Sequence, residues 1–599
     1  MPREFLMGNE AIALGALHAG VNLAAGYPGT PSSEILETLA KRGGDGVYVE
    51  WSVNEKAALE MAAGAAYAGA RTLVTMKQVG LNVASDPLMS LAYVGVKGGM
   101  VVVAADDPGP ISSQTEQDTR TFAKFSKLPV FDPSSPEEAY RMVGQAFELS
   151  EQYGTPVLLR PTTRVCHGCA SVKVAQQGQP HAPEGFVKDT GRWVIFPRTS
   201  YLNHIRIEQR NQKLGEILSH SPCNRLTGSG TLGVAAGGVS DAYLSEALLG
   251  VDVPVKRLKV GTPHPFPETL AAEFLEGLTD VLVLEELDPV IERELTALCG
   301  KLHLPVKIHG KLDGTLPCAG ESSVDLVKGA LYPFLGLALP ERAEGTPPQL
   351  PARPPVLCAG CPHRASFYAV KQAVKGRKAV FCGDIGCYTL GNAMPLDMVD
   401  TCLCMGAGVT MAQGLGRAEP GTLPFAFLGD STFFASGLTG VVNAVYNQAE
   451  LILIVLDNST TAMTGHQPHP GTGRTLMGAQ VEPVSIPKVL EGLGVRWVRT
   501  VDPLDLAAAV DTVRQAAQEK GVRAIIFKSP CIAVAKPLGC YAVDGAKCID
   551  CKKCIRELGC PALVLENGRP AVESSLCFGC ALCAQVCPTG AIEKKGGGQ

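Results

Sequence analysis

The chain has 599 residues, of which 46% are hydrophobic and 19% charged, and its formal net charge is -5. A single hydrophobic core stops growing at roughly 250 to 300 residues, so this length predicts several well-packed domains and excludes a disordered or fibrous protein. Lys and Arg do not form a block, so we expect neither a nucleic-acid partner nor an anionic membrane surface as partner.

Two features of the sequence bear on location. The start of the chain, residues 1–6, lacks the layout of a signal peptide. No apolar run approaches the roughly 18 residues that a membrane span needs, and the run at 451–456 has the length of a strand. We therefore expect a cytoplasmic protein whose partners are small molecules and other proteins.

Helix-like and strand-like segments alternate over most of the chain, which predicts α/β domains with parallel sheets covered by helices on both faces. In residues 1–185 the expected helices are 10–19, 55–68 and 136–151, and the expected strands are 47–50 and 100–105. A polar connection at 176–192 and a polar helix at 198–218 follow. The second α/β domain, 195–339, has expected strands at 232–236 and 281–285 and helices at 241–249 and 289–298.

A proline-rich interval at 340–355 indicates an extended linker. The third α/β domain, 356–537, has expected strands at 379–382, 425–428, 451–457 and 524–528. The composition changes at 538–599, where the chain becomes rich in Cys and Gly and poor in long periodic segments. We interpret this tail as a separate α+β module.

Nine of the 21 cysteines fall in the last 60 residues, at spacings typical of metal ligands rather than disulfides. One run is Cys548, Cys551, Cys554 and Cys560-Pro561, and the other is Cys577, Cys580, Cys583 and Cys587-Pro588. The second run has the C-x2-C-x2-C-x3-C-P spacing of a 4Fe-4S site, in which the fourth Cys ligates the other cluster of a pair. The predicted sets are therefore Cys548, Cys551, Cys554 and Cys587 for one cluster, and Cys577, Cys580, Cys583 and Cys560 for the other.

The first run departs from this pattern, because five residues rather than three separate Cys554 from Cys560. The longer loop leaves the ligands available. The alternative is zinc held by the C-x-x-C pairs, which would not require two similar runs that each end in Cys-Pro.

Polar residues follow two strands of the third α/β domain. Gly429, Asp430 and Ser431 come after one strand and Asn458 after the next, so their side chains meet at the carboxyl edge of the sheet. Magnesium takes oxygen ligands that it often shares with phosphates, so we predict a site for it made by Asp430, Asn458, a carbonyl near Thr460 and a diphosphate. The spacing resembles the Gly-Asp-x…Asn motif of thiamine diphosphate sites, although an ordinary strand-end turn gives the same letters.

Thiamine chemistry also needs a buried carboxylate that protonates the pyrimidine N1′. Residues 54–71 resemble the helix that carries this Glu, and Glu55 is the candidate, with Glu50 and Glu60 as rivals. The alternative for Glu55 is a solvated carboxylate at a helix start, where the helix dipole favours negative charge.

Four further segments carry a family resemblance over nearly the whole chain: 27–34 (YPGTPSSE), 358–364 (CAGCPHR), 383–388 (GDIGCY) and 458–465 (NSTTAMTG). They resemble the 2-oxoacid:ferredoxin oxidoreductases, and the last three resemble the indolepyruvate branch. The resemblance implies a pyrimidine-binding domain at 1–185, a transketolase-C-like domain at 195–339, a diphosphate-binding domain at 356–537 and a two-cluster ferredoxin-like tail.

The resemblance also implies a reaction, in which an arylpyruvate is oxidatively decarboxylated to an aryl-acyl-CoA and CO2 while ferredoxin is reduced. This chain would be the large subunit, with thiamine diphosphate, Mg2+ and CoA, paired with a smaller β subunit in a heterodimer that forms a dimer of heterodimers. The alternatives are another 2-oxo acid as substrate, or an electron-transfer subunit with catalysis elsewhere. A non-oxidative thiamine decarboxylase would have no use for eight clustered cysteines.

Further residues take roles from the resemblance alone. Thr30 would donate a hydrogen bond to the 2-oxo acid, unless it is only a turn residue before Pro31. The segment 105–108 (ADDP) stands where pyruvate-specific relatives place an arginine for the substrate carboxylate, which argues against pyruvate. A third 4Fe-4S cluster would use Cys358, Cys361, Cys387 and Cys531, with inert buried thiols as the alternative.

The remaining candidate residues are better explained by structural roles than by chemistry. Cys402, Cys404 and the pair Cys166 and Cys169 lack a complete ligand set, and we interpret them as structural. Two histidines, His363 and His466, could assist proton transfer, although a loop histidine is more often solvated or packed.

Overall fold

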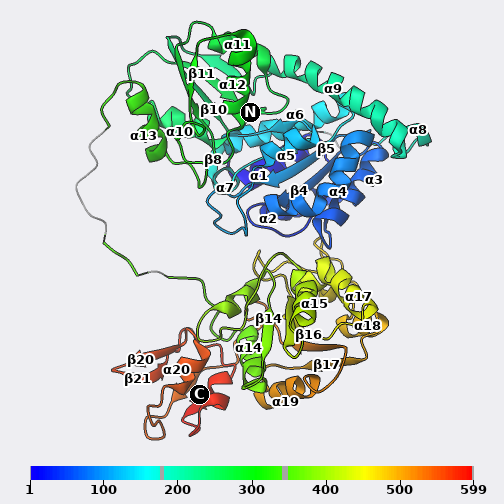
Figure 1. Ribbon diagram of the computed structural model, residues 1–599, viewed down its shortest axis with the longest axis vertical. Coiled ribbons are helices and arrows are strands. Elements are labelled where there is room, and N and C mark those ends of the chain that lie inside the picture. The colour runs from blue at the N-terminus through cyan, green and yellow to red at the C-terminus, as the bar shows by residue number, and fades with distance from the viewer. Residues whose placement is uncertain (1, 176–177, 179–180, 340–347, 352, 596–599) are drawn as a thin grey trace. The chain divides into compact units, whose positions relative to one another are not determined.

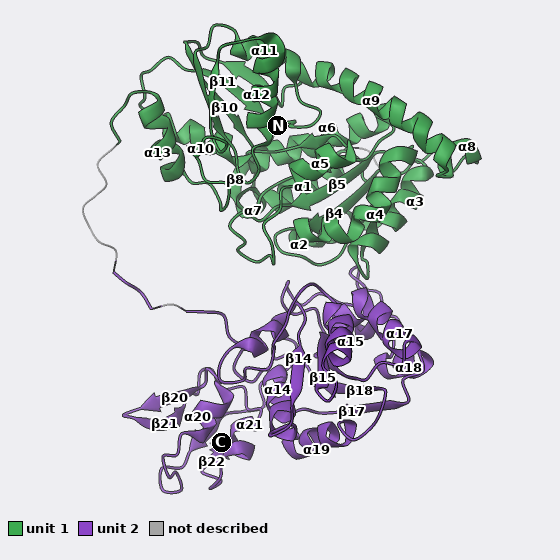
Figure 2. Cartoon of the chain, viewed as in Figure 1, with its two compact units in different colours: residues 1–346 green, residues 347–599 purple. Residues whose placement is uncertain are grey.

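The computed structural model describes residues 2–175, 178, 181–339, 348–351 and 353–595 (Figure 1). The chain forms two compact units, 1–346 and 347–599 (Figure 2). Most of the predicted linker at 340–355 lies outside the described residues.

The first unit begins with a parallel six-stranded sheet in the order β3-β2-β4-β5-β7-β6. Its strands are β2 (Leu23–Gly26), β3 (Tyr48–Trp51), β4 (Thr72–Lys77), β5 (Met100–Ala105), β6 (Val130–Phe131) and β7 (Val157–Leu159). Its helices are α1 (Gly8–His18), α2 (Ser33–Arg42), α3 (Glu55–Tyr67), α4 (Gln78–Val94), α5 (Thr119–Ser126) and α6 (Pro136–Tyr153). Helices α3 and α4 bury apolar side chains against the sheet, and α1 packs against α6. Every residue of β5 is buried, as expected for a strand covered on both faces.

A second sheet of the same unit has the order β13-β12-β10-β11-β9, with β9 antiparallel to the rest. Its strands are β9 (Arg225–Thr227), β10 (Leu232–Gly237), β11 (Lys256–Val260), β12 (Asp280–Leu284) and β13 (Lys307–His309), and its helices are α10 (Val239–Ala247), α11 (Glu268–Leu275), α12 (Val290–Leu302) and α13 (Val324–Phe334). Along the chain, three helices come between the strands of the first sheet and those of the second: α7 (Thr163–His167), α8 (Thr190–Trp193) and the long α9 (Pro197–Ser219). The strand β1 (Arg3–Met7) pairs with β8 (Cys169–Lys173), a pairing that the sequence did not predict.

Two buried arginines form ion pairs in this unit, and one of them joins its two sheets. Arg120 pairs with Asp118 at 2.7 Å and with Glu285 at 2.8 Å, so it bridges the first sheet's loops to the end of β12. Arg160 pairs with Asp106 at 2.6 Å and with Asp132 at 3.3 Å. All these side chains are nearly inaccessible, so loss of either arginine would leave uncompensated buried charge.

The second unit holds a parallel sheet in the order β14-β15-β16-β18-β17. Its strands are β14 (Ala379–Cys382), β15 (Leu423–Gly429), β16 (Leu451–Asp457), β17 (Trp497–Val501) and β18 (Val522–Lys528). Its main helices are α14 (Pro362–Ala373), α15 (Ala407–Ala418), α17 (Leu438–Tyr446), α18 (Ile486–Gly492) and α19 (Leu506–Ala516). Two apolar clusters cover the two faces of the sheet.

The cysteine-rich tail packs onto this sheet domain. It consists of β19 (Tyr541–Val543), α20 (Lys553–Leu558), β20 (Leu563–Glu566), β21 (Arg569–Val572), α21 (Leu582–Val586) and β22 (Ile592–Lys594). Leu558, Leu582 and Ile592 lie in the same apolar cluster as Phe367 and Phe427 of the sheet domain. The tail and the sheet domain therefore share one core.

The elements expected from the sequence are confirmed, with ends that move by up to four residues. Residues 100–105 and 451–457 form the strands β5 and β16 with the expected bounds. Within the described part of the chain, no helix is both long and apolar enough to span a bilayer.

Candidate active site

Four strand ends of the second unit bring polar and thiol side chains to one edge of the sheet. Asp384 follows β14, Asp430 follows β15, Asn458 follows β16 and Cys531 follows β18. These strands are neighbours and parallel, so their carboxyl ends share an edge, as the sequence predicted. The backbone N–H of Cys531 donates to the carbonyl of Asn458 at 3.0 Å, which ties the last of these loops to the third.

Asp430 is buried at the start of a short helix, α16 (Asp430–Thr432). Its Oδ2 accepts a hydrogen bond from the N–H of Ser459 at 2.8 Å and lies 3.1 Å from Nε2 of His469. The Nδ1 of His469 accepts from the N–H of Gly471, so we assign the ring proton to Nε2, which lies near the carboxylate but is not aligned with it for a hydrogen bond. Asp457 is a second buried carboxylate, and burial followed by the charge of Asp430 raises its pKa.

Asn458 is buried, and its Nδ2 lies 3.3 Å from Nε2 of His363. Burial lowers the pKa of His363 to about 4, so the ring is neutral at pH 7 and can accept this hydrogen bond. The contact fixes which end of the Asn458 amide faces the histidine. The same edge holds Thr460, whose hydroxyl donates to the carbonyl of Gln467 at 3.4 Å.

Asp384 anchors the loop after β14. Its two carboxylate oxygens accept from the N–H of Gly406 at 2.7 Å and from the hydroxyl of Tyr388 at 3.0 Å. The Tyr388 ring leaves no room for a side chain at Gly429, where a Cβ would lie 2.4 Å from a ring carbon. This packing explains why the Gly-Asp pair of the motif begins with glycine.

The observed residues fit a magnesium–diphosphate group. Two carboxylates, Asp430 and Asp457, lie close together in a buried place, where a divalent cation would relieve their repulsion. The amide of Asn458 adds a neutral oxygen ligand of the kind that Mg2+ takes. The Nε2 atom of His469 is buried without a hydrogen-bond partner and faces the same edge.

The four thiols expected to hold a third cluster lie together in this unit. The thiol of Cys387 interacts electrostatically with those of Cys531 and Cys358, and Cys361 interacts with Cys358 and Cys387. Burial raises the pKa of Cys361 to about 12 and that of Cys387 to about 11. A raised pKa favours the protonated thiol, so these side chains need a cationic centre to become thiolates. An iron–sulfur cluster would supply that centre.

The structure brings tail thiols together in two groups, and their role as cluster ligands stays a prediction. A small cavity of about 20 Å³ is lined by Cys548, Cys551, Cys554 and Cys587. In the other group, Cys583 interacts electrostatically with Cys580, Cys560 and Cys577, and burial raises its pKa to about 12. In the described residues, no three Cys, His, Asp or Glu side chains are placed as ligands of a single metal ion.

Two contacts join the third thiol group to the tail. A Cβ at Gly360, between Cys358 and Cys361, would lie 2.4 Å from Cβ of Phe578, between Cys577 and Cys580, so the two ligand loops touch. The buried guanidinium of Arg364 donates to the carbonyls of Leu357 and Leu558, both at 2.6 Å. The positive charge of Arg364 acts on the thiols of both Cys361 and Cys580 and opposes the rise in pKa that burial causes. Arg364 thus lies between two of the predicted cluster sites.

In the first unit, Glu55 is the first residue of α3 and is buried. Burial raises its pKa to about 6, with its own backbone N–H and Lys77 acting in the opposite direction. A Cβ at Gly80 would lie 2.6 Å from Oε1 of Glu55, so only glycine leaves room for the carboxylate there.

The rival carboxylates are engaged elsewhere. Glu50 accepts from the hydroxyls of Ser52 at 2.6 Å and Tyr48 at 2.8 Å. Glu60 is half-exposed and pairs with Lys56 one turn earlier on the same helix. Of the three, Glu55 alone is buried.

Thr30 lies in the loop before α2, close to two other loops. Its carbonyl accepts from the hydroxyl of Ser112 at 3.3 Å, and Nζ of Lys77 donates to the carbonyl of Ser112 at 3.2 Å. Lys77 interacts electrostatically with both Asp107 and Glu55. This lysine therefore places a cation between the Thr30 loop and Glu55.

The segment 105–108 has a structural role. Asp106 is fully buried and pairs with Arg160. Asp107 accepts from the N–H of Ser112 at 2.8 Å and from the hydroxyl of Thr163 at 2.7 Å. Both acids brace their loop.

Sequence reasoning missed Lys77, His469, Asp384 and Arg364. Lys77 is the last residue of β4 and Asp384 lies two residues after β14, so the strand-end argument applied to Asp430 could have found them. His469 and Arg364 act through contacts between distant segments, which no local pattern announces. His466, considered for proton transfer, is exposed.

Three parts of the chain match described families. Residues 14–192 match "Pyruvate flavodoxin/ferredoxin oxidoreductase, thiamine diP-bdg", residues 384–527 match "Thiamine pyrophosphate enzyme, C-terminal TPP binding domain", and residues 570–593 match "4Fe-4S binding domain".

Curated relatives match almost the whole chain. The indolepyruvate oxidoreductase subunit IorA of Methanothermobacter thermautotrophicus is 45% identical over 99% of this chain and 98% of its own length. The protein of the same name from Archaeoglobus fulgidus is 40% identical over 99% and 97%. The 2-oxoglutarate synthase subunit KorA of A. fulgidus is 26% identical and matches 53% of this chain over its full length.

The folds, the two sites and these matches define a thiamine-diphosphate-dependent 2-oxoacid oxidoreductase of the ferredoxin-linked class, with 4Fe-4S clusters in its tail. Within that class, the chain belongs to the indolepyruvate oxidoreductase subunit IorA family.

Proposed function

We propose that this chain is the large catalytic subunit of an enzyme that oxidatively decarboxylates arylpyruvates such as indolepyruvate and phenylpyruvate. One 2-oxo acid, one CoA and two oxidised ferredoxins give one aryl-acyl-CoA, CO2, a proton and two reduced ferredoxins. The observation that carries the proposal is the contact between the Cys358–Cys361 loop and the Cys577–Cys580 loop at Gly360 and Phe578. It connects the cofactor edge of the sheet with the predicted tail clusters.

Each candidate residue has a distinct task in this proposal. Gly429, Asp430, Ser431, Asn458 and Thr460 hold Mg2+ and the diphosphate. Thiamine diphosphate, when bound there, would supply the carbanion chemistry that decarboxylation of a 2-oxo acid needs. Glu55 keeps a proton on the pyrimidine N1′, for which a pKa near 6 is well suited at neutral pH. Thr30 donates a hydrogen bond to the substrate.

The cysteine sets give the electron route. Cys358, Cys361, Cys387 and Cys531 would hold a third cluster at the cofactor edge, and Cys560, Cys577, Cys580 and Cys583 would hold the cluster beside it. Cys548, Cys551, Cys554 and Cys587 would hold the remaining cluster, and together these groups would supply one-electron transfer to a soluble ferredoxin. A smaller β subunit completes a heterodimer, two of which assemble, and the enzyme acts in the cytoplasm.

The test of the reaction is ferredoxin reduction by the anaerobically prepared enzyme with its smaller subunit, measured with CoA across a series of 2-oxo acids. Indolepyruvate and phenylpyruvate should give a kcat/KM at least about tenfold above that of pyruvate, which corresponds to about 1.4 kcal/mol of discrimination. A higher value for pyruvate rejects the substrate assignment. Protein with intact clusters but no bound thiamine diphosphate under excess cofactor and Mg2+ would favour the electron-transfer alternative.

Lys77 is proposed to bind the substrate carboxylate in place of the arginine that pyruvate-specific relatives use. Replacing it by Met should raise KM by about 10- to 100-fold, because a charge-assisted hydrogen bond contributes about 1.5 to 3 kcal/mol. The control is Lys41→Met on the exposed end of α2. Steady-state kinetics distinguishes the two roles of Lys77. A fall in kcat at unchanged KM would indicate that Lys77 acts on Glu55 and not on the substrate carboxylate.

The third cluster is tested by iron content. Wild-type protein should hold about 12 irons per chain, and Cys387→Ala about 8, because one cubane is lost. Cys402→Ala, in a neighbouring exposed loop, should leave the content unchanged. A wild-type content of about 8 irons, unaffected by Cys387→Ala, would make these four cysteines inert thiols.

A further inference from the structure

A large pocket in the first unit lies away from the strand ends that carry Glu55 and Thr30. It has a volume of about 720 Å³ and is formed by the C-terminal ends of α4 and α6 together with α8 and α9. Helices in such a fold run back along the sheet, so their C-termini lie at the opposite edge from the strand ends. The volume falls within the range of small-molecule sites, about 300 to 1,000 Å³.

Three arginines line this pocket: Arg192 from α8, and Arg206 and Arg210 from α9. In the part of the chain that the structure describes, none of them lies within ion-pair distance of a carboxylate. The one acid in the lining, Asp189, is occupied as the N-cap of α8, where it accepts from the N–H groups of Gly191 and Arg192. The pocket therefore carries an uncompensated positive charge.

Each guanidinium uses only part of its donor capacity within the protein. Arg192 donates to the carbonyl of Val96 at 2.8 Å, and Arg210 to the carbonyl of Lys127 at 2.7 Å. Arg206 donates to Oδ1 of Asn203 at 3.1 Å. A guanidinium has five N–H donors, so several remain on each for a ligand. Burial alone lowers the pKa of Arg210 to about 10, with no acid opposing the shift.

A simpler explanation is that these arginines only complement helix C-termini, where positive charge is favoured. Val96 lies just after α4 and Lys127 is the C-cap of α5, so this accounts for one bond from Arg192 and one from Arg210. It accounts neither for Arg206 nor for the gathering of three unpaired guanidinium groups around one cavity.

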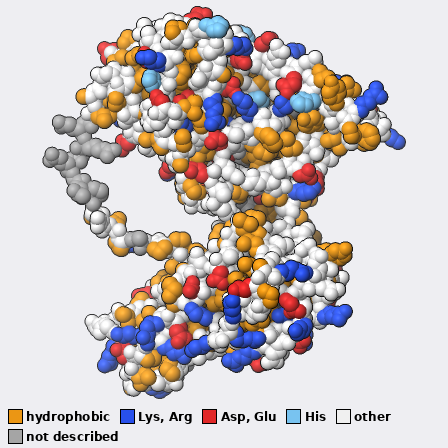
Figure 3. Space-filling view, viewed as in Figure 1, with side chains coloured by type: hydrophobic (Ala, Val, Ile, Leu, Met, Phe, Trp, Pro, Cys, Tyr) orange, Lys and Arg blue, Asp and Glu red, His pale blue; other side chains and the backbone are white. Residues whose placement is uncertain are grey.

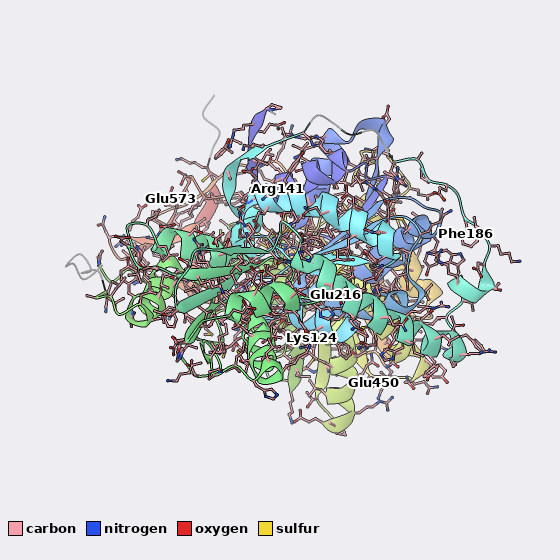
Figure 4. All side chains as sticks on the ribbon, turned by 90° about the horizontal axis from the view of Figure 1, so that it is seen from above. Lys124, Arg141, Phe186, Glu216, Glu450 and Glu573 are labelled. Carbon is pink, nitrogen blue, oxygen red and sulfur yellow. The ribbon has the colours of Figure 1, made fainter. Side chains whose placement is uncertain are left out.

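The pocket also offers aromatic surface. Tyr93 and Tyr153 both line it, and the Tyr93 ring is held edge-on by His204 at a centroid distance of 5.9 Å. In Figure 3, Lys or Arg side chains and apolar ones lie together at the upper right, where Figure 1 places α8 and the start of α9 in the same view. Phe186, at the periphery in Figure 4, is 57% exposed in the segment before α8.

We propose that this pocket binds a phosphorylated small molecule of the nucleotide class, with its phosphates on the three arginines and its planar base against the tyrosines. The guanidinium fork matches phosphate oxygens in a bidentate manner, and tyrosine rings stack on planar bases. The site is separate from the diphosphate edge of the second unit, which recognises phosphate through a bound cation. A free nucleotide and the nucleotide part of CoA offer the same chemistry.

The experiment is calorimetric titration of the full chain with pyrophosphate, ADP and CoA as separate probes, with thiamine diphosphate and Mg2+ in excess. ADP or CoA should bind with a Kd below about 1 mM. Arg206→Glu should weaken that binding at least about tenfold, since it replaces a phosphate donor by a repelling charge. The matched control is Arg198→Glu, on the same helix but outside the pocket, which should bind like the wild type.

The probes and variants distinguish the remaining sources of a signal. Stronger binding of ADP than of CoA assigns the site to a free nucleotide, and the reverse assigns it to CoA. Binding that Asp430→Asn abolishes and Arg206→Glu leaves intact belongs to the diphosphate edge and overturns the proposal. So does the absence of binding to all three probes, or an Arg206→Glu variant that loses only assembly with the smaller subunit, which would make this a protein interface.

Discussion

Replacing Glu55 by Gln is expected to lower kcat by about 10²- to 10⁴-fold while leaving cofactor binding in place. Gln keeps the shape that fits against Gly80 but cannot share an acidic proton with the pyrimidine ring. The change should be measured as ferredoxin reduction, and thiamine content should be quantified on the same protein. The control is Glu60→Gln, a half-exposed carboxylate one turn further along α3 that should leave kcat within about twofold.

The stability of the Glu55→Gln variant provides an independent readout. The folded-state pKa of about 6 lies above the ordinary value of 4.5, so the unfolded chain loses this proton first as pH rises. Glu55 therefore destabilises the fold above pH 6, by at most about 2 kcal/mol. The variant should be more stable than the wild type at pH 8 and no more stable at pH 4, as measured by denaturant unfolding. Normal turnover by this variant would remove Glu55 from the catalytic set and return Glu50 to consideration.

The sheets could be predicted because their strands are buried on both faces. The run at 451–457 is almost continuously apolar in sequence, and all seven of its residues are buried in the structure. Its strand was therefore predicted with the correct bounds. The pairing of β1 with β8 could not be predicted, because its partners lie more than 160 residues apart and neither strand alternates clearly. The shared core of tail and sheet domain also depends on long-range packing, since Leu582 reads like any helical leucine.

The site was predictable where chemistry fixes the spacing along the chain. The cysteine runs and the Gly-Asp…Asn pair are of this kind, because each ligand occupies a loop of set length. The residues that support them were not predictable. His363 could be named only as a loop histidine, whereas its contact with Asn458 joins positions 95 residues apart. Arg364, which lies two residues after Pro362 in the CAGCPHR segment, reaches Leu558 in the tail.

Replacing Asp430 by Asn is the second change with a large expected effect. The variant keeps an oxygen near the N–H of Ser459 but loses the negative charge that makes this edge attractive to a cation. Removing a supporting contact typically costs 10- to 100-fold in metal affinity, so loss of a direct ligand should weaken Mg2+-dependent binding of thiamine diphosphate by about 100-fold or more. Calorimetric titration with thiamine diphosphate at fixed Mg2+ measures the change.

The matched control is Asp511→Asn, an exposed aspartate on α19 of the same unit, for which affinity should be unchanged. The electron paramagnetic resonance of the two reduced tail clusters should be the same in both variants, because among the described interactions none joins a tail cysteine to Asp430. Loss of clusters together with the cofactor would indicate misfolding rather than a missing ligand. Wild-type affinity in Asp430→Asn would show that the cation is held elsewhere, because a buried Asn cannot replace a carboxylate that neutralises Mg2+.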